Sequence, residues 1–301
     1  MKLLLILPLL IFLACQEKKT QSVFMPDNDL ADRGINSGNL AVDEELFNTL
    51  IDEVANVYEP IIRDHGGNLF INRLWTDPTV NASAVQFDDG SWIVNMFGGL
   101  ARRQEVTADG FVLVLCHEIG HHLAGYPFVV DWAANEGSSD YYSVLGCARH
   151  LWQNKAATLG LNAIEVPVRL RELCDAIWTY PNERKLCYRT MLAGKSTASL
   201  LAALQRKTVD FSRQDNNIVE TTNNDHPNAQ CRLDTFMAAS LCMFEWDHTI
   251  IPGKSFTDRN SREAEREAAN VSCSRFFERD GSALEDIEQG YRPNCWFKPK
   301  L

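Results

Sequence analysis

The sequence predicts an α+β fold that is mainly helical and contains one small antiparallel sheet. Residues 68–97 hold three short segments rich in aromatic and branched residues, and apolar residues recur at helical spacing on both sides of that region. Of the 301 residues, 45% are hydrophobic, which is enough to fill a sizeable core. No repeat or composition break after residue 45 marks a second domain, so we expect residues 43–301 to form a single domain.

Residues 1–14 are typical of a bacterial lipoprotein signal peptide. An apolar run follows Lys2 and ends at Leu13-Ala14-Cys15, and it is shorter than the roughly 20 residues that a spanning helix needs. We therefore expect lipidation of Cys15 and attachment to a membrane of the cell envelope, and Gln16 is compatible with the periplasmic face of the outer membrane. Residues 15–42 are polar and lack periodicity, which predicts a flexible tether behind the lipidated cysteine.

The elements of the domain follow in chain order. A first helix is predicted from Asp43, because apolar residues then recur at helical spacing. Residues 69–75, 83–87 and 92–97 predict three strands. Asp89-Gly90 favours a hairpin turn between the last two, because glycine readily adopts a positive φ. From Thr107 to the C-terminus the pattern predicts helices joined by loops.

Charge and cysteine content restrict the partners and the compartment. The formal net charge of −11 argues against nucleic acid as a partner, because phosphate binding requires clustered Lys and Arg. Eight cysteines besides Cys15 favour disulfides in an exported chain. The short separations favour Cys174 with Cys187 and Cys273 with Cys295. A thiolate zinc cluster is the alternative, but the chain contains no CxxC pair.

Residues 107–124 predict a largely buried helix that carries an HExxH motif. His117 and His121 lie four residues apart and project from one helical face, so a single ion can bind both imidazoles. Glu118 is offset by about 100° around the helix. That offset keeps it off the metal but near the water that a catalytic zinc retains, which is the place of a general base.

A third ligand is required, because catalytic zinc takes three protein ligands. Glu136 is the candidate, and in a helix Asp140 lies beside it on the same face. Asp140 would accept the second ring N–H of a ligating histidine. An HExxH sequence also occurs by chance in solvated helices. The apolar run before His117, the ExxxD pattern and the predicted export favour the zinc site.

These motifs resemble the gluzincin metallopeptidases that include HtpX, the CAAX prenyl proteases and their soluble periplasmic relatives. The likeness covers roughly residues 45–245 and includes Asn81-Ala82 and Gly99-Leu100 ahead of the HExxH motif. It implies a zincin-like metallopeptidase domain in which an edge strand flanks the HExxH helix and binds extended substrate. Carried over, that strand holds peptide through its main chain. It comprises Trp92, Ile93, Val94 and Asn95.

The family also has a His-Pro pair followed by an arginine, which His226-Pro227 and Arg232 match. The resemblance implies that His226 donates to the oxyanion or blocks the zinc as an inhibitory fourth ligand. Arg232 would orient this region or pair with a carboxylate. A surface histidine and a plain salt bridge are the alternatives. The gap from His121 to Glu136 is short for this family, and the many cysteines are atypical of it.

The sequence thus predicts a zinc-dependent endopeptidase of the cell envelope with one Zn²⁺ per chain. Its substrates would be unfolded or extended proteins or peptides. Two alternatives stay open: a zinc-binding periplasmic chaperone or binding lipoprotein with a closed or blocked site, and a cell-wall peptide amidase. A peptide carbonyl looks the same in a protein and in a cell-wall peptide, so the sequence does not separate these substrates.

Overall fold

The computed structural model describes residues 21–35, 40–155, 166–274 and 290–300. The signal peptide predicted for residues 1–14 and the lipidation predicted at Cys15 lie outside the described residues. Within the described part of the chain, no helix combines the length and the apolar character needed to cross a bilayer.

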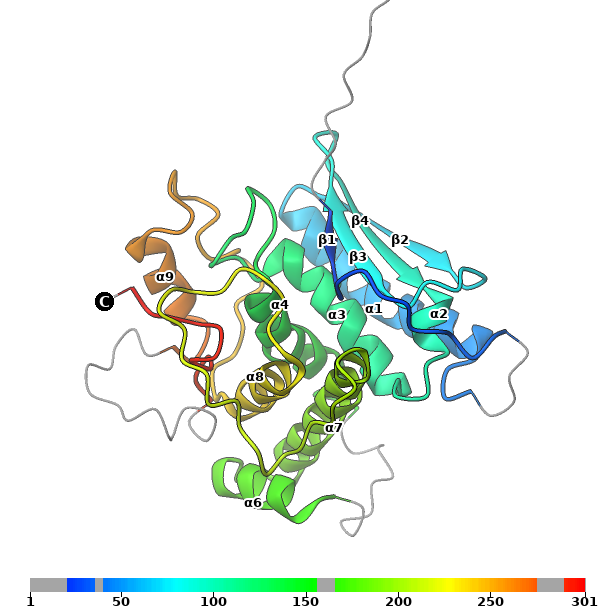
Figure 1. Ribbon diagram of the computed structural model, residues 1–301. Coiled ribbons are helices and arrows are strands. Elements are labelled where there is room, and N and C mark those ends of the chain that lie inside the picture. Colours follow the sequence, from blue (N-terminus) through cyan, green and yellow to red (C-terminus); the bar gives the residue numbers. More distant parts are fainter. Residues whose placement is uncertain (1–20, 36–39, 156–165, 275–289, 301) are drawn as a thin grey trace, which may run out of the picture.

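A mixed four-stranded sheet lies on one side of the molecule (Figure 1). Its order is β1 (Ser22–Val23), β3 (Ala82–Gln86), β4 (Ser91–Phe97) and β2 (Asn68–Leu74). β3 and β4 form the expected antiparallel hairpin, with Gly90 at a φ of 86° in its turn. β2 pairs parallel with β4. The prediction of an antiparallel sheet is therefore wrong for β2, which reaches β4 from the far side of the hairpin.

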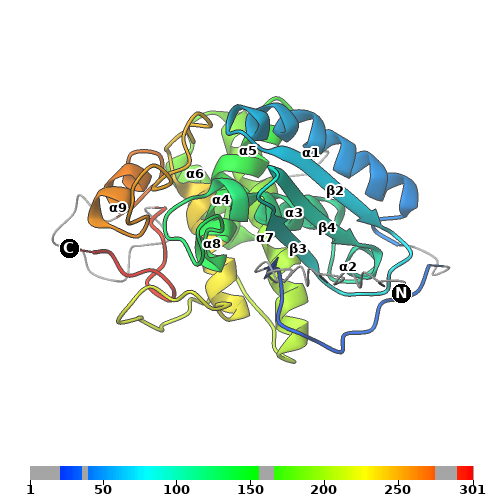
Figure 2. The same cartoon turned by 90° about the horizontal axis from the view of Figure 1, so that it is seen from above.

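Helix α1 (Glu44–Asp64) confirms the first predicted helix. Asp43 is its N-cap, and a carboxylate oxygen of Asp43 accepts a hydrogen bond from the Leu46 amide (2.8 Å). Its buried face includes Phe47, Ile51 and Val54. The helix runs alongside β2 (Figure 2) and also contacts α3, so its apolar face closes one end of the core.

Helix α3 (Ala108–Leu123) lies at the centre of the molecule and confirms the predicted HExxH helix. Thr107 is its N-cap, and Oγ1 of Thr107 accepts a hydrogen bond from the Gly110 amide (3.0 Å). All residues from Gly110 to Leu123 are buried. The reason is visible in Figure 1, where α3 lies between the sheet on one side and α4 (Glu136–Tyr142) and α7 (Pro181–Leu204) on the other.

The other helices complete the domain around α3. They are α2 (Gly98–Ala101), the π-helical η1 (Ser143–Ala148), α5 (Arg149–Trp152), α6 (Val168–Ile177), α8 (Ala229–Leu241) and α9 (Arg262–Ala269). α8 begins after its N-cap Asn228. Pro227 therefore precedes the cap.

Four disulfides join elements that are distant in the sequence. They are Cys116–Cys147, Cys174–Cys187, Cys231–Cys295 and Cys242–Cys273. The predicted pair Cys174–Cys187 is confirmed, and the predicted pair Cys273–Cys295 is wrong. Cys231 and Cys242 lie at the two ends of α8. Cys231 pairs with Cys295, and Cys242 pairs with Cys273. The separation along the chain was therefore a poor guide to separation in space.

The segment before α1 is partly built into the fold. Ser22 and Val23 form β1, and Phe24 and Met25 are fully buried. The flexible tether predicted for residues 15–42 is therefore wrong for residues 22–25. Short strands of this kind carry no periodicity, and here the pairing with β3 sets the conformation.

Candidate metal centre

Three predicted ligands meet where α3 passes the start of α4. Nε2 of His117 lies 3.3 Å from Oε2 of Glu136, and Nε2 of His121 lies 3.5 Å from Oε1 of Glu136. All three side chains are buried. This group could hold a metal ion.

The close approach of the two helices follows from small residues and a cap. A Cβ at Gly120 would lie 2.9 Å from the Ser139 carbonyl oxygen, so only glycine allows α4 to pass this close without displacement. Asn135 caps α4 by accepting a hydrogen bond from the Ser138 amide (2.9 Å). The cap fixes Glu136 as the first residue of the helix, directed at the histidines.

The donor set fits a zinc-sized cation. Two ligands at about 2.1 Å from a tetrahedral zinc are about 3.4 Å apart, and the measured separations are 3.3 and 3.5 Å. Among the described residues, several buried polar atoms here have no hydrogen-bond partner: Nε2 of His117, Oε2 of Glu136 and both carboxylate oxygens of Glu118. Buried polar atoms are nearly always satisfied, so a cluster of such atoms at one point fits a group that could hold a metal ion.

The second nitrogen of each imidazole is held by a neighbour. Nδ1 of His117 lies 2.8 Å from Asp140, where the sequence placed that carboxylate. Nδ1 of His121 lies 2.9 Å from the Ala134 carbonyl oxygen and 3.0 Å from Oγ of Ser139. Both rings therefore direct Nε2 at the centre of the group. Sequence reasoning missed Ala134 and Ser139, because a main-chain carbonyl and a lone serine give no motif.

Arg232 ties α8 to this centre. It is fully buried, and its Nε and Nη2 atoms donate to the two oxygens of Asp140, both at 2.6 Å. Nη2 also lies 3.7 Å from Glu136. The sequence left open whether Arg232 orients this region or pairs with a carboxylate, and in the structure it pairs with the carboxylates of Asp140 and Glu136. Burial lowers the pKa of Arg232, but the hydrogen bonds to Asp140 and the charges of Asp140, Glu136 and Glu118 together outweigh it and raise that pKa overall.

Burial and charge divide the titratable groups of the site. Burial raises the pKa of Glu118 to about 8 and lowers the pKa of His121 to about 4. Burial also opposes the charged form of His117, but Asp140 and Glu136 outweigh it and raise the pKa of His117 to about 9. Burial raises the pKa of Glu136, but its interactions with His121, His117 and Arg232 outweigh this effect and hold that pKa well below the usual range. Without a metal, His117 therefore carries a proton at neutral pH.

His226 lies at the mouth of the site. Its Nε2 donates to the Val23 carbonyl oxygen (2.7 Å) and lies 3.5 Å from Oε1 of Glu136. Its side chain is 26% exposed. His226 is outside the three-residue group whose ligand atoms lie close enough to share an ion.

The strand predicted to bind substrate is not at an edge. Trp92, Ile93, Val94 and Asn95 lie in β4, which pairs with β3 on one side and β2 on the other. The main-chain groups of β4 are thus used within the sheet, and the predicted role as a substrate edge strand is wrong. β3 instead has its outer edge toward the metal site, and β1 occupies that edge.

His122, next to a ligand in sequence, is buried away from the centre. Its ring stacks on Trp92 with centroids 5.3 Å apart and lies 5.2 Å from Trp132. Burial lowers its pKa to about 3. His122 therefore packs the sheet against α3 as a neutral side chain and does not face the ligands.

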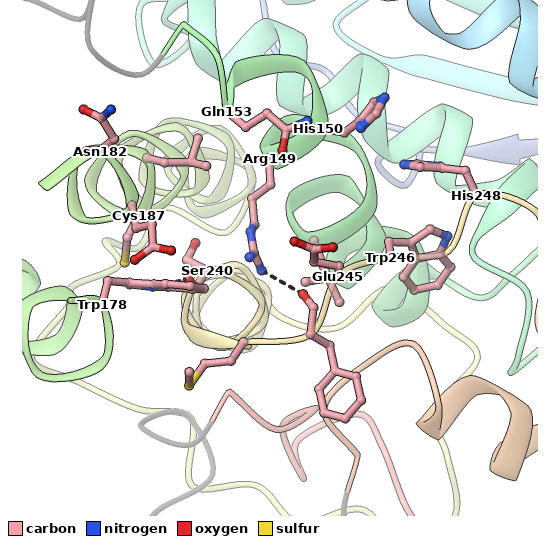
Figure 3. A pocket seen from close by; sticks show the side chains of 15 residues that line it. Arg149, His150, Gln153, Trp178, Asn182, Cys187, Ser240, Glu245, Trp246 and His248 are labelled. Carbon is pink, nitrogen blue, oxygen red and sulfur yellow. Dashed lines mark hydrogen bonds between the residues drawn. The ribbon is translucent and has the colours of Figure 1, made fainter. Parts of the chain in front are cut away.

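A separate hollow of about 520 Å³ lies between α5, α6, α7 and the chain after α8 (Figure 3). Trp178 and Trp246 line it, and Arg149 lies at its floor. The guanidinium of Arg149 stacks 4.9 Å from the Trp178 ring and donates to the Cys242 carbonyl oxygen (2.6 Å). Its charge is thus used in packing, and none of the predicted site residues lines this hollow.

Comparison of the chain with protein-family models, with curated proteins and with solved structures gives no match in any of the three. The likeness to the gluzincins therefore stays one of motifs, and the geometry of the centre carries the functional argument.

Proposed function

We propose that this protein is a zinc-dependent endopeptidase that hydrolyses peptide bonds of extended proteins in the bacterial cell envelope. One observation carries the proposal: two imidazoles and one carboxylate converge with unsatisfied atoms beside a buried glutamate that binds nothing else among the described residues. A structural site needs no such glutamate. A hydrolytic site needs one to take a proton from water.

Each residue has a role in this proposal. His117, His121 and Glu136 hold the ion, and Asp140 and Arg232 fix the ring of His117. A bound zinc supplies charge that polarises the substrate carbonyl and acidifies water. A cation bound at this point would favour the charged form of Glu118 against the effect of burial on its pKa. In that form Glu118 accepts the proton of the attacking water and passes it to the leaving amine. His226 donates a hydrogen bond to the carbonyl oxygen as it becomes negative.

The contact of His226 argues against a closed binding site. Structural zinc sites usually have four protein ligands. The Nε2 atom of His226 instead donates to a main-chain carbonyl, and the described residues offer no fourth ligand within the group. The fourth position is thereby left to water and substrate.

The test is proteolysis of unfolded, fluorescently labelled casein by the purified protein with one equivalent of zinc. We expect cleavage that a chelator abolishes and added zinc restores. The Glu118→Gln variant keeps zinc but should lose at least about 100-fold in rate, because general-base catalysis contributes that much or more. A folded Glu118→Gln protein with full activity would contradict the proposal.

A parallel incubation with cell-wall fragments separates the substrates. Chelator-sensitive cleavage of the fragments with no cleavage of casein would replace the endopeptidase by an amidase. Zinc binding with no hydrolysis of either substrate, including after the release of residues 21–25 described below, would favour a binding lipoprotein.

A further inference from the structure

The N-terminal segment of residues 21–25 lies along the sheet edge that faces the metal site. β1 pairs antiparallel with β3, with Val23 opposite Ser83. The amide of Phe24 continues the ladder by donating to the Ala82 carbonyl oxygen (3.0 Å). An extended peptide that binds by strand addition has this geometry.

Two residues of the proposed catalytic centre hold the main chain of this segment. Nε2 of His226 donates to the Val23 carbonyl oxygen (2.7 Å), and Nη1 of Arg232 donates to the Phe24 carbonyl oxygen (2.8 Å). The two donors are therefore paired with two consecutive carbonyls of this segment. The acceptors are main-chain carbonyls, so these bonds do not depend on the side chains of the segment. A peptide of different sequence in the same register would also make them.

Further contacts extend on both sides. The side-chain amide of Asn81 both accepts from the Met25 amide and donates to the Met25 carbonyl, each at 3.0 Å. Oγ of Ser22 lies 3.1 Å from Nε2 of His121, the atom directed at the metal position. The segment thus reaches from a clamp at one end into the metal centre at the other.

The side chain of Phe24 is buried in the hydrophobic core next to the ligands. It is fully buried, and its ring lies edge-on to the His117 ring with centroids 5.1 Å apart. The Arg232 guanidinium lies 4.5 Å from the centre of the Phe24 ring. Burial of an aromatic side chain of this size contributes about 2 kcal/mol or more, so Phe24 anchors the segment.

The segment is followed by a stretch that would have to detach from the domain for the segment to leave. Residues 26–31 are exposed or half-buried and contain no helix or strand. Within this stretch, Nδ2 of Asn28 donates to the Val80 carbonyl oxygen (3.2 Å) and Nη1 of Arg103 donates to the Ala31 carbonyl oxygen. Just beyond it, the carboxylate of Asp32 accepts from Nε of Arg102 (2.8 Å). Release of residues 21–31 removes the two-residue strand β1 and takes the buried side chains of Phe24 and Met25 out of the core. It leaves Asn81, His226 and Arg232 with the hydrogen bonds that an incoming peptide must satisfy.

We propose that residues 21–25 occupy the substrate cleft as an intramolecular substrate mimic, and that the substrates displacing them are extended peptides with a large apolar residue in the place of Phe24. This inference rests on the proposed function in treating the cleft as a substrate site. A tethered segment acts at an effective concentration on the order of millimolar. Free substrate must therefore compete with it, and the segment restrains activity.

The experiment releases the segment after folding. Residues 27–31 are replaced in the full-length Glu118→Gln protein by the recognition sequence of a site-specific protease. The folded protein is cut, and the N-terminal fragment is removed by gel filtration. A fluorescent peptide with the sequence of residues 21–28 is then titrated in with zinc present. We expect the cut protein to bind this peptide at least tenfold more tightly than the uncut protein does.

The peptide itself provides the specificity control. A peptide in which the residue equivalent to Phe24 is alanine should bind the cut protein at least tenfold more weakly. Equal binding of the two peptides would overturn the proposal that a large apolar residue is required in the place of Phe24. A fragment that leaves only in denaturant would show that β1 is a permanent strand, which would overturn the proposal.

Hydrogen exchange on the uncut protein gives an independent readout. In Phe24→Ala the backbone amides of residues 24 and 25 should lose protection, while α3 stays protected. The matched control is Phe70→Ala, an exposed phenylalanine of β2, which should leave residues 21–25 unchanged. Unchanged protection at Met25 in Phe24→Ala would contradict the proposal.

Hydrolysis is measured separately on cut protein that retains Glu118. If released protein binds the peptide and cleaves nothing, the occupancy of the cleft stands and the proposed endopeptidase activity fails. If the released protein cleaves casein and binds no peptide of residues 21–28, the activity stands and the mimic fails.

Discussion

At the scale of single residues, the centre depends on how Asp140 holds one imidazole. Asp140 binds Nδ1 of His117 and forms two hydrogen bonds with Arg232, and all three side chains are buried. The carboxylate therefore fixes the ring and balances the arginine charge. Partners of this kind tune a metal site through its ligands.

Replacing Asp140 by asparagine should weaken zinc binding by about 10- to 100-fold, because the ring of His117 loses its charged partner. The dissociation constant is measured by competition with a chromophoric chelator. Asp109→Asn is the matched control, since Asp109 forms a similar pair of hydrogen bonds with Arg189 at the start of α3. Equal losses in the two variants would show that Asp140 acts only through general stability.

Zinc affinity should depend steeply on pH. The pKa of His117 is raised to about 9 without the metal, so binding must displace its proton at any lower pH. The dissociation constant should therefore rise at least tenfold for each unit that the pH falls between 8 and 6.5. Titrations across this range check it. An affinity that does not change with pH would contradict a protonated His117.

Some contacts at this scale had signals in the sequence and others had none. The spacing of His117, His121, Glu136 and Asp140 was enough to expect them around one point. The Ala134 carbonyl and Ser139 were not predictable, because their contribution depends on how closely α4 passes α3 at Gly120. Asn81 belongs to the recognised Asn-Ala pair, but its clamp on Met25 appears only when the N-terminal segment is in place.

At the scale of elements, two helices carry the ligands and a disulfide holds them together. Cys116 precedes His117 in α3, and Cys147 lies in η1, which continues α4. The bridge therefore fixes the distance between the helix with the histidines and the helix with Glu136.

Replacing Cys116 and Cys147 by alanine should lower the free energy of unfolding by about 3–4 kcal/mol and weaken zinc binding by tenfold or more. Urea denaturation and zinc competition measure the two effects. The control is the double replacement of Cys174 and Cys187, whose bridge joins α6 and α7 away from the ligands. That variant should lose similar stability and keep its zinc affinity. Unchanged zinc binding in the first variant would contradict the positioning role of the bridge.

Local sequence patterns predicted the helices and strands well, but they did not predict which strands pair with one another. The spacing of apolar residues from Asp43 and the pattern of residues 107–124 predicted the starts of α1 and α3 to within a residue. The parallel pairing of β2 with β4 was missed because strands close in sequence usually pair as hairpins. The choice of β4 as the edge strand was wrong for the same reason, since the edge depends on the order of strands in the sheet.

At the scale of the whole molecule, the metal centre joins segments from three parts of the chain. α3 and α4 supply the three candidate ligands, α8 supplies Arg232, and the N-terminal segment accepts hydrogen bonds from His226 and Arg232.

Metal binding should therefore stabilise the entire fold. An ion that binds only the folded chain adds about 4 kcal/mol at a free concentration 1,000 times its dissociation constant. The thermal midpoint should rise by several degrees on addition of zinc and return when a chelator is added. Scanning calorimetry with Glu136→Gln as the control checks this. An equal rise in that variant would place the stabilising ion elsewhere.

The most direct measurement is the metal content of the purified full-length protein beside His117→Ala and Glu136→Ala, by elemental mass spectrometry. We predict one zinc per chain in the parent protein and a loss of at least nine-tenths of it in each folded variant. Full occupancy in both variants, or a parent protein that takes up no zinc, would contradict a metal centre built from these residues.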